Sequence, residues 1–200
     1  MADLGEGPSC AALVAAAEAR FGGIDLLVAV ATAGATPGRI DDADWDEWRH
    51  AFDVNVVGTL ELSRLAARSM AARGGGAIVH VGTFGTHSLP THQAAYTATK
   101  LAAVAGAKTL AKELGPAGVR VNVVTPGYTT GAGLDRLLAA AALRRDEPEA
   151  VVSDRLAATA ALRRHVDPID IAEAVLFLCS ARARAITGVE LPVTAGQHPL

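Results

Sequence analysis

Short apolar runs alternate with longer helical patterns along this chain. The apolar runs are IDLLVAVATA (24–33), AIVHVGT (77–83), VRVNVVT (119–125) and VELPV (189–193). Helical patterns cover residues 42–73, 93–114, 133–145 and 168–181, and an alanine-rich one covers 9–21 with Ser9 as a candidate N-cap. The alternation of strands and helices at this spacing predicts parallel βαβ units. It therefore predicts a three-layer α/β fold, in which helices cover both faces of a parallel sheet. The run 24–33 is apolar almost throughout, which predicts a strand covered on both faces.

We expect one domain over residues 1–200, because this length suits a single core and no linker or repeat interrupts it. The net charge of −3 provides no general attraction to nucleic acid or to an anionic membrane. No apolar run approaches a membrane span, and the N-terminus lacks the basic and then apolar order of a signal peptide. Cys10 and Cys179 are too isolated to form a disulfide framework or a zinc site. These features predict a cytoplasmic protein that binds no nucleic acid, no membrane and no metal.

Several small or polar residues directly follow the predicted strands. They are Gly34, Thr83 and the pair Pro126-Gly127. In a parallel α/β sheet the ligand lies outside the carboxyl ends of the strands. We therefore expect these residues to lie on one rim and to face one pocket.

Tyr96 and Lys100 are four residues apart in AAYTATK (94–100), within a predicted helix. Side chains at i and i+4 lie on one face of a helix, so the phenol and the ammonium project together. A free phenol titrates near about 10, and a nearby ammonium lowers that value. Such a tyrosine can exchange a proton with a carbonyl or alcohol oxygen near neutral pH. The spacing alone is common by chance, but Thr83 ends the preceding strand, and Asn55 in the preceding helix is an amide that needs a polar partner if it is buried.

Six segments, in order, resemble the short-chain dehydrogenase/reductase family. They are FGGIDLLV, DADWDEW, DVNVVGTLELSRLAARSM, GGGAIVHVGT, AAYTATKLAAVAGAKTLAKELGPAGVRVNVVTPG and DIAEAVLFLCSARARAITGVELPV. The resemblance implies a Rossmann-like sheet and hydride transfer between NAD or NADP and a small-molecule ketone or secondary alcohol. It implies that Tyr96 is the proton donor or acceptor and that Lys100 lowers its pKa and binds the nicotinamide ribose. Asn55 would hold a water that links Lys100 to solvent, and Thr83 would stand where the family usually has serine.

The resemblance also implies a set of cofactor contacts. Pro126 and Gly127 would line the nicotinamide side, and Ala33 and Gly34 belong to the loop that follows a central strand of the family. Asp3 matches the acid that contacts the adenine.

The chain departs from the family pattern in three places. The glycine-rich turn that cradles the cofactor pyrophosphate is missing, together with roughly the first βαβαβ portion, so we expect an N-terminally truncated domain. The loop Ala31-Thr32-Ala33-Gly34 replaces the usual Asn-Asn-Ala-Gly, and Thr83 adds a methyl group that narrows the pocket. Without its usual neighbour, strand 24–33 would be a bare sheet edge.

Three functions remain open on this basis. The first is the family's hydride transfer. The second is a redox-neutral isomerase, dehydratase or cyclase that uses Tyr96, Thr83 and a loop histidine, His87 or His92. The third is a non-catalytic interaction protein that docks through strand 24–33.

The alanine-rich helices at 54–73 and 93–114 resemble those that pair subunits in the family, which implies a homodimer or homotetramer. His80 stands within a predicted strand and is expected to be a packed structural residue.

Overall fold

The computed structural model describes residues 2–197, so residue 1 and residues 198–200 of the expected domain lie outside the described part. Its strands form one parallel sheet in the order β1-β2-β3-β4. The strands are β1 (Leu26–Ala29), β2 (Gly76–Val81), β3 (Val119–Pro126) and β4 (Glu190–Val193). The parallel sheet with helices on both faces confirms the predicted α/β, Rossmann-like class.

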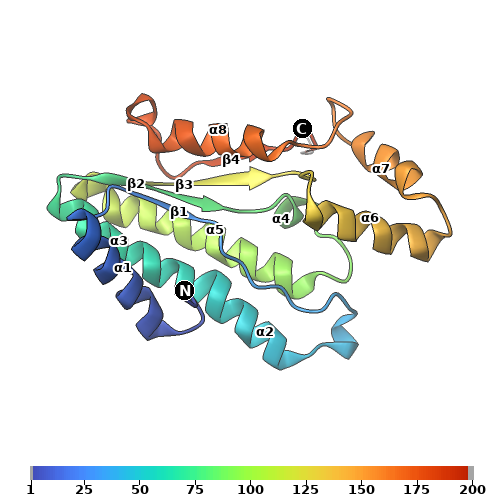
Figure 1. Cartoon of the computed structure of the whole chain (residues 1–200), viewed down its shortest axis with the longest axis horizontal. Coiled ribbons are helices and arrows are strands. Elements are labelled where there is room, and N and C mark those ends of the chain that lie inside the picture. The colour runs from blue at the N-terminus through green and yellow to red at the C-terminus, as the bar shows by residue number, and fades with distance from the viewer. Residues whose placement is uncertain (1, 198–200) are drawn as a thin grey trace.

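Helices form the two outer layers. The α-helices are α1 (Gly7–Phe21), α2 (Trp45–Phe52), α3 (Thr59–Ala72), α4 (Gly85–Ser88), α5 (Ala94–Leu114), α6 (Ala132–Arg145), α7 (Glu149–Ala157) and α8 (Pro168–Cys179). Short 3-10 helices cover Ile40–Asp42, Gly115–Ala117 and Ala181–Ala183, and a π-helical turn covers Asp53–Gly58. Helices α1, α2, α3 and α5 lie on one side of the sheet and α8 on the other, while α6 and α7 extend beyond the carboxyl ends of the strands (Figure 1). Within the described residues, no helix is both long and apolar enough to cross a membrane.

The core surrounds β3, which pairs with β2 on one side and β4 on the other. Val121 packs with Met70 and Ile78 in the cluster under α3 and α5. Val124 packs with Leu178 in the cluster under α8. Strands buried on both faces are expected to be apolar at consecutive positions, and β3 has this pattern.

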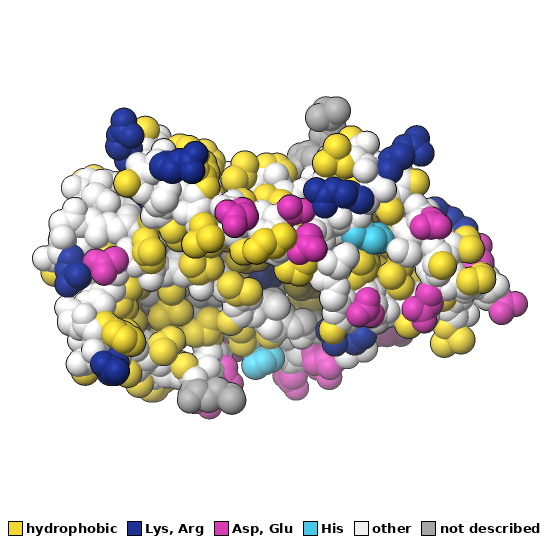
Figure 2. All heavy atoms as spheres, turned by 45° about the horizontal axis from the view of Figure 1, so that its top comes forward, with side chains coloured by type: hydrophobic (Ala, Val, Ile, Leu, Met, Phe, Trp, Pro, Cys, Tyr) yellow, Lys and Arg dark blue, Asp and Glu magenta, His cyan; other side chains and the backbone are white. Residues whose placement is uncertain are grey.

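The prediction that strand 24–33 is covered on both faces is wrong. The strand is shorter, Leu26–Ala29, and lies at the edge of the sheet. Leu27 packs on the α3 side, but Leu26 and Val28 are 53% and 41% exposed, because α8 packs over β2, β3 and β4. Figure 2 shows hydrophobic side chains gathered in a hollow below α8. Apolar character alone does not reveal whether a helix covers a given face.

Helix starts follow local capping chemistry. Asp44 caps α2 by accepting hydrogen bonds from the amides of Asp46 and Glu47, as the acid-rich start of the predicted region 42–73 leads one to expect. Ser9 does not cap α1, which begins at Gly7; its hydroxyl instead accepts a hydrogen bond from the amide of Asp3.

Candidate active site

Tyr96 and Lys100 project from the first turns of α5. Lys100 is 7% exposed, and its Nζ donates a hydrogen bond of 3.1 Å to the carbonyl oxygen of Val81 at the end of β2. Tyr96 is half-buried, and its hydroxyl has no hydrogen-bond partner within residues 2–197. Both residues therefore lie in the first two turns of α5, the phenol without a partner among residues 2–197 and the ammonium buried.

Burial changes the titration of this ammonium. Because the charged form is disfavoured away from water, the pKa of Lys100 is lowered to about 8. Lys100 therefore titrates much closer to neutral pH than an exposed lysine does.

Thr83 follows β2 and faces the same hollow as Tyr96. This hollow has a volume of about 420 Å³, and Pro126 and Gly127 also line it. The Oγ1 atom of Thr83 accepts a hydrogen bond of 3.2 Å from the amide of Gly85, so the hydroxyl proton can be donated elsewhere. The structure thus brings four predicted site residues to one cavity.

Asn55 lies beneath the site, in the π-helical turn Asp53–Gly58, and is buried. Its Oδ1 accepts hydrogen bonds from the amide of Ala33 at 2.8 Å and from the Thr32 hydroxyl at 3.1 Å. Its Nδ2 donates to the carbonyl of Ala33 at 2.7 Å and to the Thr99 hydroxyl at 3.0 Å. The side chain therefore braces the loop after β1 against α5, next to Lys100. Its expected water contact remains a prediction.

Gly34 borders a second hollow, of about 270 Å³, which also includes Tyr96 and His92. Tyr96 therefore stands between two hollows. One is formed by the loop after β1, and the other by the loops after β2 and β3.

Asp3 is not brought to Tyr96. It lies with Thr32 at a third hollow of about 350 Å³, and its carboxylate accepts a hydrogen bond from the amide of Gly5. Because the Thr32 hydroxyl also donates a hydrogen bond to Asn55, Asp3 lies near the loop after β1 rather than near Tyr96 and Lys100.

His80 is buried in β2, as expected for a structural residue. Ser63 donates its hydroxyl proton to the Thr59 carbonyl, so at 2.8 Å its oxygen accepts from Nε2 of His80. Burial, followed by the nearby charge of Lys100, lowers the pKa of His80 to about 4. The histidine is therefore neutral at physiological pH. In the described part of the chain, no group of histidines, cysteines and acids is arranged to hold a metal.

Sequence reasoning missed one polar cluster near the site. Glu190 at the start of β4 binds His87, Lys108 and Thr125. The available signal was an acid inside the apolar run VELPV (189–193).

The sequence and the structure of this chain were compared with those of known proteins. A family model described as enoyl-(acyl carrier protein) reductase matches residues 1–198. The chain is 36% identical to 2-(S)-hydroxypropyl-CoM dehydrogenase 3 of Xanthobacter autotrophicus over 98% of this chain and 74% of that protein. It is 35% identical to inactive 2-(S)-hydroxypropyl-CoM dehydrogenase 2 of the same organism over 98% of this chain and 82% of that protein.

Among solved structures, NAD+-bound xylitol dehydrogenase superimposes with a TM-score of 0.89 at 26% identity, over 98% of this chain and 77% of the other. The sequence match and the structural match both extend over nearly all of this chain, including the helix of Tyr96 and Lys100. The chain therefore belongs to the short-chain dehydrogenase/reductase family of oxidoreductases.

Proposed function

We propose that this chain transfers hydride between a nicotinamide cofactor, NAD or NADP, and a ketone or secondary alcohol. One observation carries the proposal. The unpartnered phenol of Tyr96 lies one helical turn from the buried ammonium of Lys100 and borders the same hollow as Thr83. The named activities of two relatives, 2-(S)-hydroxypropyl-CoM dehydrogenase 3 and xylitol dehydrogenase, support the same reaction class.

Each residue has a role in proton transfer. In the reductive direction, Tyr96 donates its hydroxyl proton to the carbonyl oxygen while carbon receives the hydride, and the product is an alcohol. The ammonium of Lys100 stabilises the resulting phenolate and so lowers the barrier to proton transfer. Thr83 donates its hydroxyl proton in a hydrogen bond to the same oxygen and orients it. Oxidation of an alcohol reverses these steps.

The donor set fits the nicotinamide half of the cofactor. The carbonyl oxygen of Val81 accepts a hydrogen bond from one of the three N–H groups of Lys100. No other acceptor within residues 2–197 binds the remaining two N–H groups, so they are available to donate to ribose hydroxyls. Pro126 and Gly127 would border the nicotinamide ring, which supplies or accepts the hydride when bound. Ala33 and Gly34 would contact the cofactor from the loop after β1. We assign no described residue to the pyrophosphate.

Asp3 would contact the adenine end. Its hollow near Thr32 is separate from the one at Tyr96, as an extended cofactor requires. Leu134 and Leu137 of α6 line the hollow at Tyr96, so the part of the substrate that does not react would meet apolar side chains there.

The test is the variant Tyr96→Phe, which removes one oxygen and keeps the ring. We expect calorimetric titration to detect NADH or NADPH binding by both wild type and variant. We expect loss of turnover by at least about a hundredfold, the contribution typical of a general acid. The readout is the change in nicotinamide absorbance with a panel of cyclic and β-keto carbonyl compounds.

The matched control is Tyr128→Phe, which alters the chain's other tyrosine. Tyr128 lines the same hollow but has no lysine four residues later, so loss of its hydroxyl should lower turnover far less than Tyr96→Phe does. Full activity in Tyr96→Phe would refute the proposal. A folded wild-type protein that binds neither cofactor would favour redox-neutral chemistry or a non-catalytic role.

A further inference from the structure

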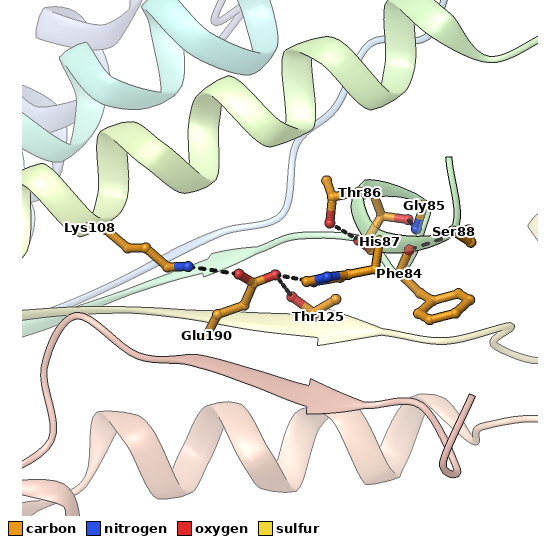
Figure 3. Close-up of polar contacts among 9 residues, drawn as sticks. Phe84, Gly85, Thr86, His87, Ser88, Lys108, Thr125 and Glu190 are labelled. Carbon is orange, nitrogen blue, oxygen red and sulfur yellow. Dashed lines mark hydrogen bonds and ion pairs between the residues drawn. The ribbon is translucent and has the colours of Figure 1, made fainter. Parts of the chain in front are cut away.

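Glu190 is a largely buried carboxylate at the start of β4, with a side chain 12% exposed. It accepts three hydrogen bonds of 2.9 Å each, from Nζ of Lys108, Oγ1 of Thr125 and Nε2 of His87. These donors belong to α5, β3 and α4, so one carboxylate joins three elements to β4 (Figure 3). Because a carboxylate only accepts, the Nε2 atom of His87 must carry the proton in this contact.

The cluster is organised around a negative charge. Burial raises the pKa of the Glu190 carboxyl, but hydrogen bonds from Lys108, His87 and Thr125 together lower it below its usual value. Glu190 is therefore ionised at neutral pH. Hydrogen bonds to an ionised acceptor are about twice as strong as those between neutral groups. The hydrogen bond from His87 to Glu190 therefore holds the His87 side chain strongly in place.

His87 lies within α4, the short turn that closes around Thr83. Both the amide and the hydroxyl of Thr86 donate to the carbonyl of Thr83, at 3.2 and 2.8 Å. The amide of Gly85 donates to the Thr83 hydroxyl oxygen. Three consecutive residues of α4 therefore connect Thr83 to Glu190, and a movement of this turn would also move the Thr83 hydroxyl.

We propose that Glu190 is a positioning residue that, through His87, fixes the α4 turn and holds the Thr83 hydroxyl toward Tyr96. The catalytic part of this inference rests on the proposed function, whereas the ordering of the turn does not. Lys108 reaches the other carboxylate oxygen of Glu190 from the side opposite His87 (Figure 3). It therefore offers a control that perturbs the cluster without removing the link to α4.

The first experiment measures hydrogen exchange in peptides covering residues 83–93 of the cofactor-free protein. We expect His87→Ala and Glu190→Gln to exchange about tenfold faster there, because a hydrogen bond to a charged group shifts a local opening equilibrium by about that factor. His87→Gln, whose Nε2 can replace the histidine donor, should restore slow exchange. Lys108→Met should leave this segment close to wild type. Unchanged exchange in His87→Ala and Glu190→Gln would overturn the proposal, as would equal acceleration in Lys108→Met.

The second experiment measures reduction of the same carbonyl panel. We expect kcat/KM to fall about tenfold in His87→Ala and Glu190→Gln and to recover in His87→Gln. Lys108→Met should leave kcat/KM unaffected. The dissociation constant for NADH or NADPH should be the same in all of these variants. Faster exchange without a change in kcat/KM would overturn the positioning role. A wild-type protein without turnover would overturn the proposed function, while the exchange data would still decide whether Glu190 orders the turn.

Discussion

The ammonium of Lys100 is held in an unfavourable environment. Its burial lowers its pKa from 10.5 to about 8, and the carbonyl of Val81 compensates for only part of the lost hydration. In the folded protein, Lys100 loses its proton at lower pH than in the unfolded chain. A residue kept at a cost to stability is expected where it serves binding or catalysis.

The pH dependence of stability follows from this difference. Below about pH 8 the lysine is charged in both states, and the full burial penalty is present. Between about pH 8 and 10.5 the unfolded chain binds more protons, so the free energy of unfolding rises with pH, by at most about 3 kcal/mol from this group.

We expect the wild type to gain this stability relative to Lys100→Met when urea unfolding is compared at about pH 7 and about pH 10. Lys112→Met, at an exposed position further along α5, is the control and should not alter the pH trend. A difference between wild type and Lys100→Met that is independent of pH would contradict this account.

The π-helical turn Asp53–Gly58 joins α2 to α3 and shapes the site from below. Insertions of this kind are frequent at functional sites because they redirect side chains and backbone groups. Here the turn carries Asn55 toward the loop after β1 and places Gly58 against the backbone of Leu4. A methyl group on Gly58 would overlap the carbonyl oxygen of Leu4, so glycine permits the close approach of the N-terminal segment.

Gly58→Ala is therefore expected to displace the segment that carries Leu4 and Asp3. Overpacking against backbone should lower the free energy of unfolding by more than about 2 kcal/mol, measured by urea unfolding. Gly133→Ala in α6 is the control, because a methyl group there meets open space and should stabilise its helix by up to about 1 kcal/mol. Equal stability of the two variants would show that Leu4 does not pack on Gly58 in solution.

Exposed apolar side chains on neighbouring helical segments support the proposed pairing of subunits through residues 54–73 and 93–114. Val57 in the π-helical turn is 62% exposed, and Leu101 in α5 is 51% exposed. Burying such side chains against a second copy would remove their apolar surface from water.

Leu101→Asp should therefore shift a homodimer or homotetramer toward the monomer, because a carboxylate would be desolvated at the contact. Light scattering after size-exclusion chromatography measures the mass. Leu143→Asp, at an exposed position on α6, is the control. A monomeric wild type, or identical behaviour of the two variants, would count against the pairing.

The layers of the fold were predictable because parallel strands need long crossovers, and the apolar runs at 77–83 and 119–125 are separated by a chain segment of that length. The π-helical turn was not predictable, since its residues continue the helical pattern. The exposure of Leu26 and Val28 was not predictable either, because it depends on where α8 packs.

Local spacing was enough to pair Tyr96 with Lys100, since i and i+4 share a helix face in any α-helix. Position along the chain could not pair His87 with Glu190, which are 103 residues apart and meet only when β4 adds to the sheet beside β3. Nor could it reveal the lowered pKa of Lys100, which depends on side chains from several elements excluding water. Properties of one helix or strand follow from neighbouring residues, whereas burial and long-range polar contacts arise only when the elements pack.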